Sequence, residues 1–197
     1  MRYTIMRPDG FKELAINAGI LLKDFTPETG AYKSSDILGL SSGGFHFSAK
    51  QSVINWGEDV DNCPELVKQL IKGDFWTATM GGTFVSITPA LAAKLLAAGD
   101  IDGTDATKIV PRNDIKLSDY ADLWLVGDYG EKTGDTKGGH FAIHMLNSRS
   151  SDGFDVQTKN KDKTSFAFTF TAYYDMADIT TVPFEIYAAA GEDEPTS

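Results

Sequence analysis

Alternating hydrophobic and polar residues dominate the second half of the chain. Within residues 163–174, Phe166, Phe168 and Phe170 fall on one face of an extended segment, and threonine and alanine residues fall on the other. A period of two is typical of a β-strand with one buried face. The same reasoning predicts further strands at residues 15–25, 43–50, 75–87, 123–129, 141–146, 153–158 and 181–188.

A helical period occurs at two places. Residues 89–98 place leucine and alanine side chains on one face, after a favourable N-cap residue, Thr88, and a proline at the first helical position, Pro89. Gly99 is expected at the left-handed position that ends this helix. Residues 64–72 carry a shorter apolar stripe and predict a second, short helix. The pattern as a whole predicts a mainly β fold with a helix packed on one side of it.

The spacing of these elements indicates one domain at residues 14–188. Residues 1–13 are expected to form an irregular N-terminal arm, and residues 189–197 a flexible acidic tail. Long segments without a regular period are candidates for contacts between subunits, because long loops in compact domains usually have a function. These segments are 1–13, 26–42, 57–63 and 130–139.

Charge and composition narrow the possible functions. The chain has 18 basic and 28 acidic residues, giving a formal net charge of −10. A chain this acidic is poorly suited to gripping nucleic acid, because phosphate binding needs clustered Lys and Arg. Cys63 is the one cysteine, so we expect no intrachain disulfide and a reducing compartment. No signal-peptide or membrane-spanning pattern occurs, so no membrane association is expected.

None of the candidate reactive groups has the spacing of a known site. On a strand, His140 and His144 would lie roughly 13 Å apart, too far to share one metal. The acidic residues within 100–105 lack the spacing of a calcium loop, and the glycine-rich segment 130–139 is not a phosphate-binding loop. Cys63 is expected to be a buried small residue. We therefore expect no catalytic residue, no cofactor and no metal, and we do not expect an enzyme.

The three tryptophans, Trp56, Trp76 and Trp124, are expected to anchor the core of the β-domain. Because tryptophan is enriched at protein interfaces, the alternative is that one of them anchors a contact with another chain.

Four blocks of sequence follow no catalytic pattern but are distinctive as a set. Their residues are Trp56, Asp59, Asp61, Asn62, Cys63 and Pro64; Pro111, Arg112, Asn113 and Asp114; Trp124, Gly127, Asp128 and Tyr129; and Val182, Pro183, Phe184 and Glu185. In this order and at this spacing, they resemble the major tail protein, or tail tube protein, of long-tailed, non-contractile bacteriophages, especially those of Gram-positive hosts. The resemblance extends from about residue 14 to residue 187. It assigns no local role to the matched residues.

The resemblance implies a β-sandwich or β-barrel with a flanking helix. It also implies hexameric rings that stack into a tube through which genomic DNA passes without specific binding. The partners would be other copies of the chain, the tape measure, tail tip and terminator proteins. The location would be the virion tail, and the host cytoplasm during assembly. Six copies carry a formal charge of about −60 per ring (6 × −10), so we expect an acidic lumen that repels DNA.

Other functions remain open from the sequence alone. A soluble β-sandwich binding module, such as a carbohydrate-recognition domain, would stay monomeric or form one closed oligomer. A tube subunit of a contractile tail or of a secretion machine would share the fold and the assembly. An acid-dependent hydrolase would lose its activity when one or two carboxylates were replaced.

Overall fold

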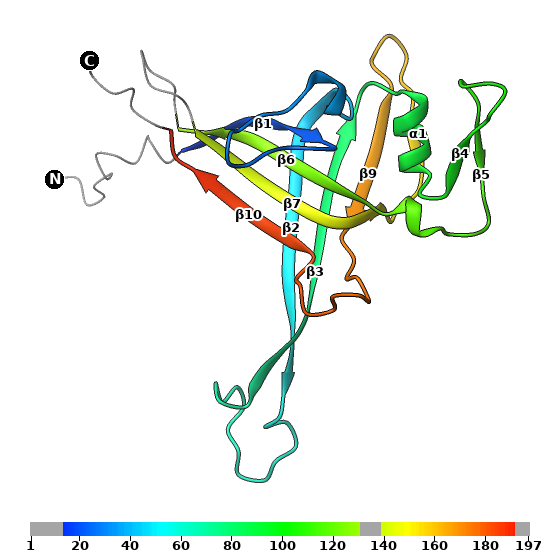
Figure 1. Ribbon diagram of the computed structural model, residues 1–197. Coiled ribbons are helices and arrows are strands. Elements are labelled where there is room, and N and C mark those ends of the chain that lie inside the picture. The colour runs from blue at the N-terminus through cyan, green and yellow to red at the C-terminus, as the bar shows by residue number, and fades with distance from the viewer. Residues whose placement is uncertain (1–13, 131–138, 192–197) are drawn as a thin grey trace, which may run out of the picture.

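Strands form most of the regular structure in the computed structural model, which describes residues 14–130 and 139–191 (Figure 1). The large sheet consists of β1 (Ala15–Leu22), β2 (Ser41–Asn55), β3 (Ile71–Phe84), β6 (Ala121–Tyr129), β7 (Gly139–Ser150), β8 (Asp155–Gln157), β9 (Ser165–Thr171) and β10 (Phe184–Ala189). The small sheet consists of β4 (Gly99–Ile101) and β5 (Ile109–Pro111). One α-helix, α1 (Pro89–Leu95), occurs in the described residues. The predicted fold class, mainly β with one flanking helix, is confirmed.

The large sheet is antiparallel and bends at β7. Its strand order is β1-β6-β7-β9-β3-β2, with β10 paired to β7 and β8 paired to β9. The first part of β7 lies between β6 and β10, whereas Arg149 and Ser150 at its end pair with β9. This change of partner turns one half of the sheet over the other, so the two halves enclose the core.

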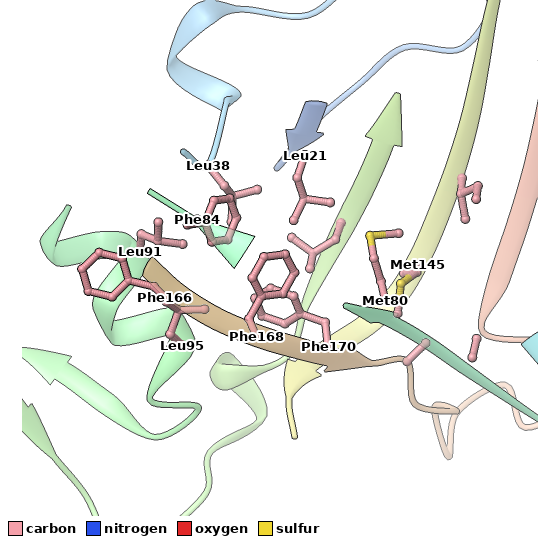
Figure 2. Close-up of a cluster of buried hydrophobic side chains, with 14 residues drawn as sticks. Leu21, Leu38, Met80, Phe84, Leu91, Leu95, Met145, Phe166, Phe168 and Phe170 are labelled. Atoms are coloured by element: carbon pink, nitrogen blue, oxygen red, sulfur yellow. The ribbon is translucent and has the colours of Figure 1, made fainter. Parts of the chain in front are cut away.

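Aromatic residues from β9 and β3 form the centre of the core (Figure 2). The rings of Phe84 and Phe168 are stacked, with centroids 4.5 Å apart. From the other half of the sheet, Leu123 and Met145 pack into the same cluster. The alternation of Phe166, Phe168 and Phe170 with alanine and threonine residues therefore marks the buried face of β9, as predicted. Full burial of one such side chain contributes about 1.5–3 kcal/mol.

The second buried cluster covers the opposite face of β1, β6 and β7. Leu22, Trp124 and Val126 are buried there beneath the loop that follows β1, which contributes Phe25. The loop is held against β1 where the Leu38 amide donates to the Leu21 carbonyl oxygen. This half of the sheet is therefore covered on both faces.

Helix α1 begins where the sequence predicts. The Thr88 hydroxyl oxygen accepts a hydrogen bond from the Leu91 amide at 3.2 Å, and the leucines of the apolar face are buried. The helix ends at Leu95, three residues before the predicted end at residue 98. The left-handed conformation falls on Ala97, with φ +64°, because Gly99 is already paired in β4. The sequence predicted neither β4 nor β5.

Strands β2 and β3 form a long hairpin whose far end projects from the body of the molecule (Figure 1). The helix predicted at residues 64–72 is wrong: this segment contains turns, Leu66 has φ +59°, and β3 already begins at Ile71. A short amphipathic helix is stable mainly when its apolar face packs on another element. The end of this hairpin has no such surface within the described chain.

Several other predicted boundaries shift. The first strand ends at Leu22 instead of residue 25, and the strand predicted to reach residue 174 ends at Thr171. Strand β10 runs to Ala189, so the predicted boundary between domain and tail at residue 189 is wrong. The predicted arm at residues 1–13, residues 131–138 of the long loop and residues 192–197 lie outside the described residues.

Removal of the central aromatic ring tests this core. We expect Phe168→Ala to lower the free energy of unfolding by about 3–5 kcal/mol, because the ring is 3% exposed and its loss leaves a cavity. The control is Phe75→Ala, which removes a ring that is 48% exposed and is expected to cost less than about 1 kcal/mol. Urea unfolding measures both values, and equal losses would contradict this description of the core.

Candidate functional site

The four sequence blocks lie at three places in the fold. Residues 56–64 form the far end of the β2–β3 hairpin, and residues 109–114 form β5 and the turn after it. Residues 122–129 lie on β6, and residues 182–187 lead into β10. The structure brings the last two blocks together, because β6 and β10 are the two neighbours of β7.

A cluster of polar and aromatic side chains joins these two blocks across β7. We call it the His144 cluster; its members are Asp122, Trp124, His144, Glu185 and Tyr187. The strand register places Trp124 opposite His144 and His144 opposite Glu185. The His144 ring stacks on the Trp124 indole, with centroids 3.8 Å apart and planes 7° apart. The Tyr187 ring also packs against this indole, with centroids 5.6 Å apart.

Both imidazole nitrogens of His144 contact carboxylates. Nε2 lies 3.1 Å from Asp122 Oδ2, and Nδ1 lies 3.4 Å from Glu185 Oε2. The Tyr187 hydroxyl donates a hydrogen bond to Glu185 at 2.5 Å. This bond lowers the pKa of Glu185, burial opposes the change, and His144 lowers that pKa further. Because the carboxylates face different nitrogens of one ring, the arrangement ties three strands together and does not form a shared metal site.

His140 has a different environment from His144, although both lie on β7. Its ring packs edge-on against Phe25, with centroids 5.1 Å apart, and it lies beside Gly30, whose φ of +66° favours glycine. In the described part of the chain, no group of three or more His, Cys, Asp or Glu side chains could hold a metal ion.

Arg112 is the centre of a second ionic cluster, which we call the Arg112 cluster. Its guanidinium contacts Asp100 at 2.8 Å and Asp119, and it donates to the Asp114 carbonyl oxygen at 2.9 Å. Lys116 adds a contact with Asp100 at 3.3 Å. The cluster joins β4, β5 and the short 3-10 helix Leu117–Asp119 (η3). Arg112 therefore has a structural role, to which Asp114 contributes its backbone carbonyl oxygen.

The pKa values in the Arg112 cluster agree with this role. A hydrogen bond to Asp119 raises the pKa of Arg112, against the effect of burial. Burial raises the pKa of Asp119, but hydrogen bonds from the Lys116 amide and from Arg112 outweigh it, so the net pKa is lowered. Both groups are therefore stabilised in their charged forms, as expected of a structural ion pair.

The block at residues 56–64 and the residues that follow it expose large apolar side chains. We call residues 56–70 the hairpin tip. Trp56 is 63% exposed and Leu66 is 78% exposed, and Val60 is also exposed. The prediction that all three tryptophans anchor the core is therefore wrong for Trp56, whereas Trp124 is buried. Trp56 directly follows β2 at the far end of the hairpin, away from the body, so the described chain offers no core to bury it.

The hairpin tip has a defined conformation despite this exposure. The Asn55 side-chain oxygen accepts a hydrogen bond from the Gly57 amide at 3.0 Å. Gly57 is buried, and a Cβ added there would lie within 3.0 Å of side-chain atoms of Leu70 and Cys63. The packing at this position therefore leaves no space for a larger residue. Cys63 itself is only half-buried, so its prediction as a buried small residue is only partly met.

Comparison of the chain with protein-family models and with curated protein sequences finds no match. The resemblance to tail tube proteins therefore stays a prediction. Among residues 14–130 and 139–191, no helix combines the length and the apolar character needed to cross a bilayer.

The pH dependence of stability tests the His144 cluster. The folded-state pKa of Glu185 lies below its ordinary value of 4.5, so its contribution to stability is present above that pH and is lost as the pH falls through the folded-state value. We expect Glu185→Gln to lower the free energy of unfolding at neutral pH and to match the wild type in acid. Urea unfolding over this range measures the difference, with Glu65→Gln at the exposed hairpin tip as control. A difference that does not change with pH would contradict the assignment.

Proposed function

We propose that the chain is a structural subunit that assembles into stacked rings, the tail tube of a long-tailed, non-contractile bacteriophage. The observation that carries this proposal is the projecting β2–β3 hairpin with its exposed apolar tip. Further support comes from the open strand edges and from the acidic charge of the chain. The sequence resemblance points in the same direction.

The hairpin tip is better suited to an interface than to solvent. Trp56, Val60 and Leu66 expose apolar surface on one short segment. Exposed apolar patches of this kind usually mark contacts with other molecules, and tryptophan is enriched in the centres of interfaces. Contact with another copy would remove this surface from water.

Open strand edges offer a way to build a ring. Within the described residues, β10 pairs only with β7, and β2 pairs only with β3. An unpaired edge can accept a strand from a neighbouring copy. A contact between two different edges, such as β10 of one copy and β2 of the next, is head-to-tail. Head-to-tail contacts close into a ring when the rotation from one copy to the next allows it.

The charge of the chain suits a passive acidic conduit. A net charge of −10 per copy repels DNA, so DNA can pass without being held. A lumen lined with clusters of Lys and Arg would instead bind the phosphates and retain the DNA. The tape measure, tail tip and terminator proteins would be its partners in the virion, and the host cytoplasm would be the place of assembly. A tube subunit of a contractile tail or secretion machine would share these features.

Electron microscopy of concentrated, purified protein tests the proposal. We expect tubes or stacked rings of uniform width for the wild type. We expect few or none for the double variant Trp56→Ser/Leu66→Asn, because it removes the apolar surface of the tip; asparagine tolerates the positive φ of position 66. The thermal unfolding midpoint should stay close to that of the wild type, because both side chains are exposed.

The control is Leu117→Asn, which removes a leucine that is 91% exposed but lies outside the tip. It should assemble as the wild type does. Persistent monomers of the wild type under all conditions would contradict the proposal and would favour a binding module.

A further inference from the structure

The hairpin tip and the turn between β8 and β9 lie at opposite ends of one strand. Strand β3 starts beside the tip at Ile71 and ends at Phe84, which pairs with Phe166 immediately after that turn. Figure 1 shows the tip at the bottom and the turn at the top of the view. The 14 residues of β3 span about 46 Å at ~3.3 Å per residue.

These two ends carry opposite charges. The hairpin tip has four acidic residues and one basic residue, a net charge of −3; they are Glu58, Asp59, Asp61, Glu65 and Lys68. All five residues are exposed. Their charges are therefore available to a second molecule.

The turn at the other end is locally basic in an acidic chain. We call residues 157–165 the β8–β9 turn. It contains Lys159, Lys161 and Lys163 against the single acidic residue Asp162, a net charge of +2. Lys159 contacts Asp162 at 3.0 Å, yet its side chain is 75% exposed.

A groove of about 540 Å³ lies between this turn and the adjoining ends of β2 and β3. Lys159, Lys163 and the single acidic residue Asp162 line one part of it, a net charge of +1, and Ser42, Thr83 and Val85 line another. The groove therefore offers positive charge, hydroxyl groups and an apolar side chain to a segment that carries acidic and apolar residues.

We propose that the hairpin tip of one copy docks against the β8–β9 turn of a second copy in the next ring. This inference rests on the proposed function and names the surface that receives the tip. Charge complementarity favours this orientation, because two tips or two turns placed together would repel each other. A contact between different ends of identical subunits leaves both outer ends free, so rings can be added one after another with a single polarity.

Charge reversal tests the contact in the full-length chain. We expect Glu58→Lys/Asp61→Lys to raise the critical concentration for polymerisation at least about tenfold, because both contacting surfaces become basic. We expect Lys159→Glu/Lys163→Glu to do the same, because both become acidic. The charge-reversal variants leave unchanged the residues of both surfaces that have positive φ angles, which are Asp59, Asn62, Leu66 and Lys161.

The combined variant carries all four substitutions and restores opposite charges at the contact. We expect its critical concentration to return close to the wild-type value, whereas Lys33→Glu/Lys50→Glu, outside both surfaces, should resemble the wild type. Sedimentation of polymer at a fixed, low salt concentration measures all five proteins, with thermal unfolding as a check on folding.

Two results would overturn the inference. Either both reversed variants polymerise as the wild type does, or the combined variant stays as defective as its parents. If the wild type itself forms no tubes, the proposed function fails, and the inference fails with it.

Discussion

The one-sided support of the β2–β3 hairpin is the constraint on which this account depends. Strand β3 pairs with β9 only from Thr79 to Phe84, where the aromatic core holds it. From Ile71 to Phe75, the strand pairs only with β2 in the described residues, whereas the Trp76 amide donates to the Tyr174 hydroxyl and the Ala78 carbonyl oxygen accepts from the Ala172 amide. An isolated two-stranded hairpin is only marginally stable in water. A hairpin this long, with apolar residues at its end, is therefore better explained as half of an intermolecular contact than as a free arm.

The two ionic clusters support this interpretation because they account for residues that could otherwise suggest chemistry. In the His144 cluster, an imidazole between two carboxylates joins β6, β7 and β10. In the Arg112 cluster, a guanidinium joins the small sheet to η3. Both clusters link separate elements of the body from which the hairpin projects.

The sequence predicted those features that depend on local periodicity. The alternation around Phe166 to Phe170 identified the buried face of β9, and Thr88 with Pro89 identified the start of α1. The prediction failed where tertiary surroundings decide the structure. Leu66 and its neighbours have a helical stripe but no surface to pack on, so they form turns. The three-residue strands β4 and β5 are too short to give a period.

Strand register explains why the sequence alone could not identify the His144 cluster. Trp124, His144 and Glu185 become neighbours only because β6 and β10 flank β7 in one particular register. The sequence blocks around residues 122–129 and 182–187 were noticed as distinctive, but their contact was not predictable from spacing. Exposure of Trp56 has a similar cause, since it depends on how far the hairpin extends beyond the core.

Hydrogen–deuterium exchange in dilute and in concentrated, assembled protein tests the central claim most directly. If identical copies cover the hairpin, amides in residues 56–75 should become more protected on assembly, while amides of β9 in the core should change little. Equal exchange of residues 56–75 in both states, in a sample that electron microscopy shows to be assembled, would contradict the account.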